Sequence, residues 1–171
     1  ATANLPPLTE SLQAHTRVQT AGPAITAPAT WGDPAIILYT AGTTGSPKGV
    51  VLTHGNLLWN TINYTAAYRM RPSDIELAPA PLFHASTLGR VFTYVFNAAT
   101  FILTPAFDPH ECLELIQREK VTSITQVPTM YRKLYEAAQR TCYDLRSVRR
   151  VVTGAAPMHA PAKCQLAELF P

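Results

Sequence analysis

The chain has 171 residues, of which 47% are hydrophobic and 15% charged, and its formal net charge is +3. This length suits one domain or two small ones, and the apolar fraction excludes wholesale disorder. No apolar run approaches the roughly 20 residues that span a bilayer, and the first ten residues lack the pattern of a signal peptide. We therefore expect a cytoplasmic protein without a transmembrane segment.

The lead-in, residues 1–34, is rich in Ala, Pro and Thr and shows no sustained period, apart from one short helix predicted over residues 8–17. The pattern changes at Ala35, where a short apolar run to Tyr39 predicts a buried strand that ends in a loop of small residues. Residues 50–52 are β-rich. A helix is predicted from about Asn56, because apolar residues then recur every four positions until Pro72.

The residues from Asp74 to Leu77 alternate between polar and apolar, which predicts a strand. Because Pro79 and Pro81 follow and neither can donate to a sheet ladder, we expect this strand to be short and to lie at an edge or an end. A helix start is predicted at Asp108, which precedes a proline and stands three residues before an acid. The helix that begins there carries Cys112, Leu115 and Ile116 on one face. The remaining patterns predict strands over residues 100–103, 121–127 and 148–153 and helices over 92–96, 128–140 and 159–170.

Strands that alternate with helices over this length indicate an α/β fold with a largely parallel sheet and flanking helices. Ligands of such sheets bind beyond the carboxyl ends of the strands. The loops after Tyr39, Leu77 and Val152 are therefore the predicted places for chemistry.

The cysteines and the basic residues of the chain are also candidate sites. The three cysteines, Cys112, Cys142 and Cys164, are far apart and form no C-x-x-C pair, so we interpret them as reduced thiols and expect no metal site. Eight basic residues against three acidic ones lie between Arg118 and Arg150. They form either an anion-binding patch or the solvated outer faces of helices.

The loop after Tyr39 concentrates small, hydroxyl-bearing and basic residues. It reads Tyr39-Thr40-Ala41-Gly42-Thr43-Thr44-Gly45-Ser46-Pro47-Lys48-Gly49-Val50. Glycines allow backbone amides to face an anion, hydroxyls donate further hydrogen bonds, and lysine adds a positive charge. The loop departs from the common P-loop because position 47 is proline. Its composition fits either a polyphosphate-binding loop or a surface turn.

This string resembles the phosphate-binding signature of the adenylate-forming superfamily, with Ala41 where serine is commoner. The superfamily contains acyl-CoA synthetases, luciferases and peptide-synthetase adenylation domains. Its other landmarks follow in order: the segment 51–57, the Pro-Leu-Phe-His element 81–84, the segments 107–109 and 127–131, and the adenine-side turn 152–158. The elements 53–56 and 83–84 are more similar to CoA ligases than to peptide-synthetase modules.

His84 has two readings. A histidine after Leu-Phe near a strand end is commonly a satisfied, half-buried side chain. The resemblance instead implies a catalytic position at the acyl pocket, beside the reacting carboxylate. The resemblance also implies that phosphates are held by Thr40, Gly42, Thr43, Thr44, Gly45 and Lys48, of which Lys48 is also catalytic, and that adenine is bordered by Gly154, Ala155, Ala156 and Pro157.

The implied activity is that of an ATP-dependent acid–CoA ligase acting on a fatty or other apolar carboxylic acid. It uses ATP, Mg2+ and coenzyme A, and its expected partners are these small molecules and not nucleic acid. The family's magnesium-binding glutamate, ribose-binding aspartate and small C-terminal domain lie beyond the landmarks present. We therefore expect residues 35–171 to be part of a large AMP-binding domain that does not complete adenylation alone. The alternatives are a truncated module that binds a nucleotide or partner without turnover and, more remotely, a luciferase-like oxygenase.

Overall fold

The computed structural model describes residues 28–40 and 47–171, and Trp31–Pro171 forms one compact unit. The short helix predicted at residues 8–17 lies outside the described residues. None of the helices in the described part of the chain is long and apolar enough to cross a membrane.

An antiparallel hairpin opens the described unit. It consists of β1 (Pro34–Thr40) and β2 (Lys48–Thr53), paired so that Thr40 faces Lys48. The prediction of a buried strand was wrong here, because β1 pairs only with β2, and the side chains of Ile37 and Tyr39 are 57% and 73% exposed. Gly49 is required by packing, since a Cβ there would lie 2.9 Å from Cγ2 of Ile37.

The second strand passes directly into helix α2 (His54–Tyr68). Thr53, the last residue of β2, is also the N-cap of the helix, and its hydroxyl accepts a hydrogen bond from the backbone N–H of Asn56. The Asn56 side chain in turn accepts one from the backbone N–H of Thr53. This reciprocal cap starts the helix two residues earlier than predicted. The helix ends at Arg69, whose φ of 48° is left-handed.

A four-stranded sheet of parallel strands forms the centre of the fold. Its strands are β3 (Ile75–Ala78), β4 (Thr100–Leu103), β5 (Ser123–Gln126) and β6 (Arg150–Thr153), in the order β4-β3-β5-β6. The predicted α/β class with a largely parallel sheet is confirmed. Of the two predicted alternatives, an edge or an end, the edge position was wrong, because β3 lies between β4 and β5. Pro79 and Pro81 follow the last ladder residue, so they end the strand without depriving it of a donor.

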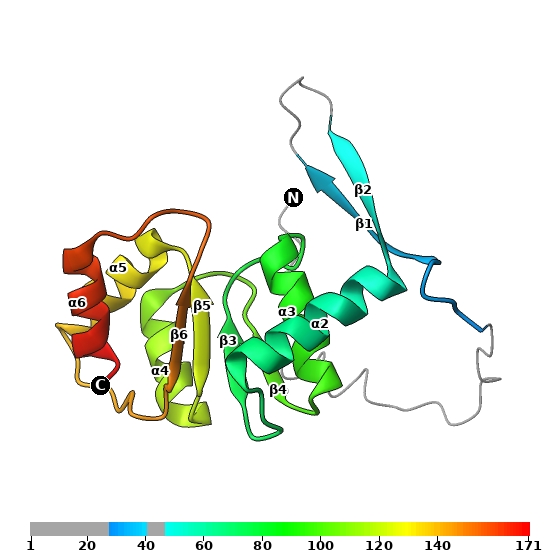
Figure 1. Cartoon of the computed structure of the whole chain (residues 1–171). Helices are drawn as coiled ribbons and strands as arrows, with labels where there is room; N and C mark the ends of the chain where they lie inside the picture. Colours follow the sequence, from blue (N-terminus) through cyan, green and yellow to red (C-terminus); the bar gives the residue numbers. More distant parts are fainter. Residues whose placement is uncertain (1–27, 41–46) are drawn as a thin grey trace, which may run out of the picture. The chain divides into compact units, whose positions relative to one another are not determined.

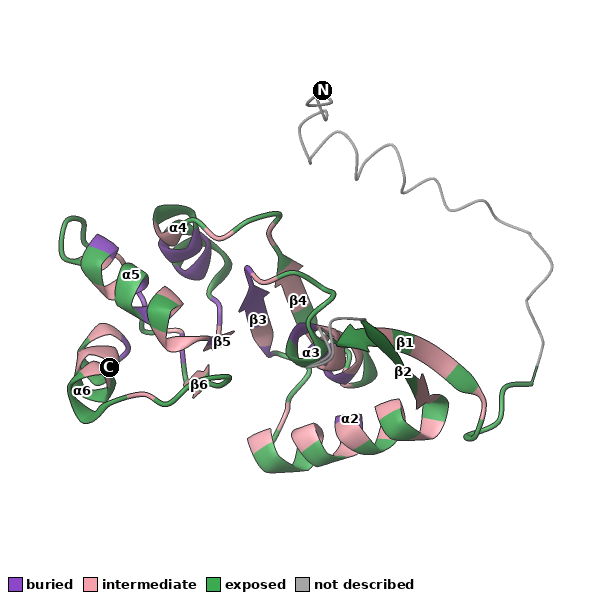
Figure 2. Cartoon of the chain, turned by 90° about the horizontal axis from the view of Figure 1, so that it is seen from above, coloured by how far each residue is buried: buried purple, intermediate pink, exposed green. Residues whose placement is uncertain are grey.

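Helices cover both faces of this sheet. They are α3 (Ala85–Phe96), α4 (Pro109–Glu119), α5 (Pro128–Ala138) and α6 (Ala160–Leu169). Helices α2 and α3 lie on one side and α4, α5 and α6 on the other (Figures 1 and 2). The chain moves outward in one direction from β3 to β4 and in the other from β5 to β6. Right-handed crossovers then require α3 and α5 to lie on opposite faces.

The main hydrophobic core lies between the sheet and the α4–α6 layer (Figure 2). The predicted start of α4 is confirmed, since the Asp108 carboxylate accepts a hydrogen bond of 2.9 Å from the backbone N–H of Glu111. Cys112, Leu115 and Ile116 are all buried on the inner face of that helix. The local start signal and the apolar spacing of this segment therefore predicted where the helix begins and which face is buried.

Charged side chains are buried beneath the α2–α3 layer. Asp74 is 1% exposed and contacts the guanidinium groups of Arg149 and Arg150. Its carboxylate also accepts a hydrogen bond of 3.0 Å from the backbone N–H of Arg71. Burial alone would raise the pKa of Asp74, but these hydrogen bonds and the two arginine charges hold it below its ordinary value.

The basic stretch 118–150 is largely ion-paired. Arg118 and Arg132 each pair with an acid on their own helix, and Asp144 pairs with both Lys120 and Arg146. The acidic partners in these exposed pairs neutralise much of the positive charge that suggested an anion-binding patch.

Candidate functional site

A cavity of about 690 Å³ lies at the carboxyl ends of the parallel strands. Its walls come from the loop after β3 and the start of α3, from Pro105–Phe107 after β4, from the end of β5 with Met130, and from the loop after β6. The connections from β3 and β5 diverge here toward opposite faces of the sheet. Such a switch point leaves a crevice in which ligands of open α/β sheets bind. The volume is within the usual range for small-molecule sites.

His84 stands at the entrance to α3 and lines this cavity. It is the N-cap residue, but its side chain makes no capping hydrogen bond. The imidazole is exposed and packs against the ring of Phe83 with 4.6 Å between centroids. It is therefore available to a ligand at the mouth of the cavity. The N-terminus of α3 adds a partial positive charge that favours an anionic group there.

Gly154 and Ala155 line the same cavity from the loop after β6. A Cβ added to Gly154 would meet nothing within 4 Å, so the space beside its backbone is open. Ala155 has a φ of 63°, a left-handed conformation that is uncommon for alanine and costs on the order of 1 kcal/mol. An open backbone surface beside a strained turn suits the close approach of a flat ring such as a nucleobase.

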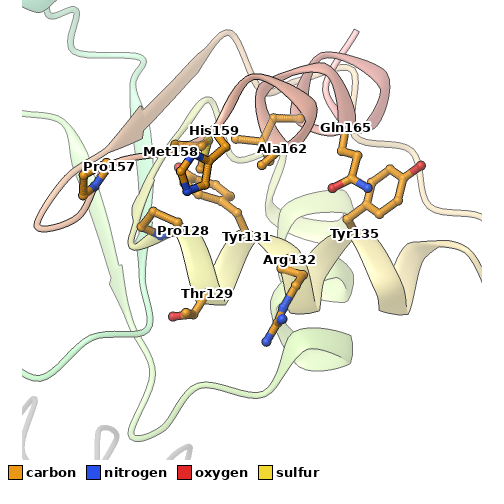
Figure 3. A pocket seen from close by; sticks show the side chains of 11 residues that line it. Pro128, Thr129, Tyr131, Arg132, Tyr135, Pro157, Met158, His159, Ala162 and Gln165 are labelled. Atoms are coloured by element: carbon orange, nitrogen blue, oxygen red, sulfur yellow. The ribbon is translucent and has the colours of Figure 1, made fainter.

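The other two residues predicted at the adenine turn lie elsewhere. Pro157 lines a separate pocket of about 200 Å³ between α5 and α6. In Figure 3 it is at the loop before α6, and Tyr135 and Gln165 are at the far end of the pocket. Ala156 lines neither this pocket nor the large cavity. The structure thus brings His84, Gly154 and Ala155 together and leaves Ala156 and Pro157 outside that group.

Thr40 and Lys48 face each other at the end of the hairpin where residues 41–47 connect β1 to β2. Both are exposed, and the Thr40 hydroxyl donates a hydrogen bond of 3.5 Å to the Lys48 carbonyl. Neither is among the residues that line the large cavity. Gly42, Thr43, Thr44 and Gly45, predicted to bind phosphate, lie outside the described residues.

The cavity also contains polar groups that sequence reasoning missed. Thr87, Arg90 and Gln126 line it, and each is at most 5% exposed. The Thr87 hydroxyl, Nε of Arg90 and Oε1 of Gln126 have no hydrogen-bond partner among the described residues. A helix start recognised at Ala85 would have shown that Thr87 and Arg90 share a helix face, but His84 provides no side-chain cap to mark it.

Arg90 is held from behind by an acid on β3. Its Nε lies 3.2 Å from Oε1 of Glu76, within ion-pair distance but without a well-aligned hydrogen bond. The Tyr94 hydroxyl donates a hydrogen bond of 2.8 Å to the other oxygen of Glu76. Burial and the charge of Glu76 raise the pKa of Tyr94 strongly, so the phenol keeps its proton. Within residues 28–40 and 47–171, no group of three or more His, Cys, Asp or Glu side chains is placed to hold a metal ion.

The sequence is similar to several acid–CoA ligases. It is 40% identical over 129 residues to feruloyl-CoA synthase from Amycolatopsis sp, covering 75% of this chain and 26% of that protein. It is 37% identical over 134 residues to long-chain-fatty-acid–CoA ligase from Bacillus subtilis (strain 168), covering 77% of this chain and 24% of that protein. The chain therefore spans about a quarter of the length of these relatives.

Solved structures show the same fold. The N-terminal domain of FACL13 from Mycobacterium tuberculosis matches with a TM-score of 0.81 at 29% identity, over 94% of this chain and 40% of that one. O-succinylbenzoate coenzyme A synthetase (MenE) from Bacillus subtilis, in complex with AMP, matches with a TM-score of 0.74 at 33% identity, over 84% of this chain and 36% of that one. A family model described as AMP-binding enzyme matches residues 2–171. With its motifs in family order on this fold, the chain belongs to the AMP-binding enzyme family.

Proposed function

We propose that these residues form the acid-binding wall and part of the nucleotide site of an ATP-dependent acid–CoA ligase. The observation that carries the proposal is the cavity of about 690 Å³ that His84, Gly154 and Ala155 share at the switch point of the sheet. The relatives are ligases of this class but act on different acids, including ferulic and long-chain fatty acids by their names. The proposed substrate is a carboxylic acid with an apolar body, either a fatty acid or an aromatic acid.

The proposed reaction has two steps. In the first, a carboxylate oxygen of the acid attacks the α-phosphorus of ATP, and the bond to the pyrophosphate leaving group breaks. In the second, the thiol sulfur of coenzyme A attacks the acyl carbon, AMP leaves, and the thiol proton is released. Repulsion between the carboxylate and the nucleotide is the main barrier that the site must lower.

His84 would hold the carboxylate in the first step. Its exposed imidazole stands at the cavity mouth and at a helix N-terminus, and both features favour an anion there. The apolar body of the acid would then lie in the cavity, against Pro79, Ala106, Phe107 and Met130.

Lys48 and Thr40 would bind phosphate oxygens. They are adjacent on paired strands at the loop end of the hairpin, so the lysine charge and the threonine hydroxyl are presented together. Gly42, Thr43, Thr44 and Gly45 complete the proposed phosphate loop. Gly154 and Ala155 would border the adenine, whose flat face fits the open space beside Gly154. Magnesium, bound with ATP, would offset phosphate charge, and we assign it no ligand in this chain.

The proposal is tested by ATP–pyrophosphate exchange and thioester formation in the full-length protein that carries this sequence. Replacing Lys48 (Lys48→Ala) should lower the exchange rate by about 10²-fold, as for loss of one charge-stabilising group. His84→Ala should lower kcat/KM for the acid. The matched control is Lys133→Ala, since Lys133 is exposed on α5 and far in sequence from the proposed loop.

The outcomes separate the candidate functions. Nucleotide binding without acid-dependent exchange in the full-length protein would favour a binding module and refute the ligase proposal. Light emission or oxygen consumption with the acid would favour an oxygenase. The 171-residue chain alone should show no exchange, and robust exchange by it would refute the view that catalysis needs further sequence.

A further inference from the structure

The α3 wall of the large cavity carries a built polar site in otherwise apolar surroundings. Thr87 and Arg90 are three residues apart on one helix face, so their side chains are neighbours. They are 0% and 5% exposed, and both line the cavity. Thr125, on β5, lines the cavity as well and adds a second hydroxyl. Proline, alanine and phenylalanine side chains form much of the remaining wall.

Thr87 and Arg90 each have a buried polar atom that makes no hydrogen bond to a described residue. The Thr87 hydroxyl has no hydrogen bond to any described residue, although it is fully buried. Arg90 forms its ion pair with Glu76 through Nε, but this Nε donates no well-aligned hydrogen bond to any described residue. A buried polar group without a partner costs free energy, because it has lost its hydrogen bonds to water. A ligand that supplies the partner recovers that free energy, so the site is poised to bind a polar atom.

The site lies deeper in the cavity than His84. Arg90 is six residues beyond His84, which corresponds to about 9 Å along the helix axis. Its partner Glu76 is two residues before the end of β3, about 7 Å below the carboxyl edge of the sheet. An acid whose carboxylate lies beside His84 would therefore reach Thr87 and Arg90 with the opposite end of its body.

Charge decides which polar group fits. The charge of Arg90 is already balanced by Glu76, which is 1% exposed and hydrogen-bonded by Tyr94. A second carboxylate on the ligand would leave a net buried negative charge, which is costly. A neutral hydroxyl avoids that cost, because it can accept from Arg90 and both donate to and accept from threonine hydroxyls.

We propose that Thr87, Arg90 and Thr125 form a subsite for a hydroxyl group at the far end of the acid substrate. The inference rests on the proposed ligase function, and it narrows the substrate class from apolar acids in general to hydroxylated ones. Arg90 is positioned by Glu76, and Tyr94 fixes Glu76 in turn. The subsite would select a phenolic or ω-hydroxy acid over an acid of the same shape that ends in a methyl group.

The test compares two acids of matched shape, para-hydroxyphenylpropanoic acid and para-methylphenylpropanoic acid, in the full-length protein. Binding of each acid is measured by calorimetry without ATP, and kcat/KM for each acid is measured by pyrophosphate exchange. We expect the hydroxylated acid to bind at least tenfold more tightly. Thr87→Val keeps the shape of the side chain and removes its hydroxyl, and it should reduce the binding ratio severalfold toward one. Thr125→Val should reduce it in the same direction.

Thr141→Val is the matched control, because Thr141 is exposed outside the cavity and should leave the ratio unchanged. Equal binding of the two acids by the wild-type protein, or a ratio that Thr87→Val and Thr125→Val both leave intact, would overturn the subsite. Exchange with both acids at equal rates would overturn the subsite and leave the ligase proposal standing. Selective binding without exchange would support the subsite and refute the ligase proposal.

Discussion

Replacing Asp74 with asparagine (Asp74→Asn) removes a negative charge that is buried against two arginines. The side chain of Asp74 is 1% exposed, whereas those of Arg149 and Arg150 are 37% and 11% exposed. Breaking a buried ion pair costs about 3–5 kcal/mol when the remaining charge has no other partner. Here Arg149 is partly hydrated, and Arg150 still donates to the Tyr68 carbonyl at 2.6 Å. We therefore expect the free energy of unfolding to fall by about 2–3 kcal/mol at pH 7.

The pH dependence provides the stricter test. Because the folded-state pKa of Asp74 is below its unfolded value, the ionised form stabilises the fold above about pH 4. That contribution is lost as the pH falls from about 4 through the folded-state pKa. Asparagine does not titrate. The difference in free energy of unfolding between wild type and Asp74→Asn should therefore be constant from pH 7 to about 5 and shrink below about pH 4.

Urea unfolding of the 171-residue chain, followed by circular dichroism at a series of pH values, measures this difference. Asp144→Asn is the control, since Asp144 also pairs with basic side chains but on the surface, and its removal should change stability much less. A loss at pH 7 no larger than that of the control would refute the reasoning. So would a difference that stays constant down to pH 3.

Two further predictions concern buried side chains. The Tyr131 hydroxyl lies 3.0 Å and 2.7 Å from backbone carbonyls on β5 and β6, so Tyr131→Phe should lower the free energy of unfolding by about 1–3 kcal/mol. Tyr135→Phe, which loses only a contact with a surface glutamate, should cost less, and equal losses would contradict the argument. Burial, with the nearby acids Glu111 and Asp108, raises the pKa of Cys112 to about 12, whereas Cys142 and Cys164 are exposed. At pH 8 the thiols of Cys142 and Cys164 should react rapidly with a disulfide reagent, and the thiol of Cys112 should react only when the chain unfolds. Equal reaction rates for all three thiols would contradict this prediction.

The elements best predicted from sequence are those with local start signals. Asp108 and Pro109 fix the beginning of α4, and the apolar spacing after them identifies its buried face. Pro128 likewise opens α5 where expected. In each case the information lies within a few residues, where capping and periodicity act.

The buried charges could not be predicted in this way. The alternation of residues 74–77 is typical of a strand with one polar face in water, yet Asp74 and Glu76 are both buried. Their burial depends on arginines that are 75 and 14 residues away in sequence, at positions 149 and 90. Such pairing is set by the strand order, which local patterns do not encode. The polar site on α3 was missed for a local reason, because no side-chain cap at His84 marks the start of that helix.

The loops after Tyr39, Leu77 and Val152 were predicted as the places for chemistry, and those after β3 and β6 line one cavity because both follow strands of one parallel sheet. The strand before the first of these loops was predicted to be buried, but β1 forms its own antiparallel pair with β2. A short apolar run has the same composition in a hairpin and in a sheet core, so its partners could not be inferred from the run itself.

The junction at Thr53 constrains how chain length can vary among relatives. One side chain both ends β2 and caps α2, with no loop residue between the strand and the helix. An inserted residue there would reverse the faces of the hairpin or rotate the helix by about 100°, since the two elements have different periods. Insertions and deletions should therefore be absent between residues 48 and 56 of relatives, and should occur instead in segments such as 139–147, which join elements without sharing a residue.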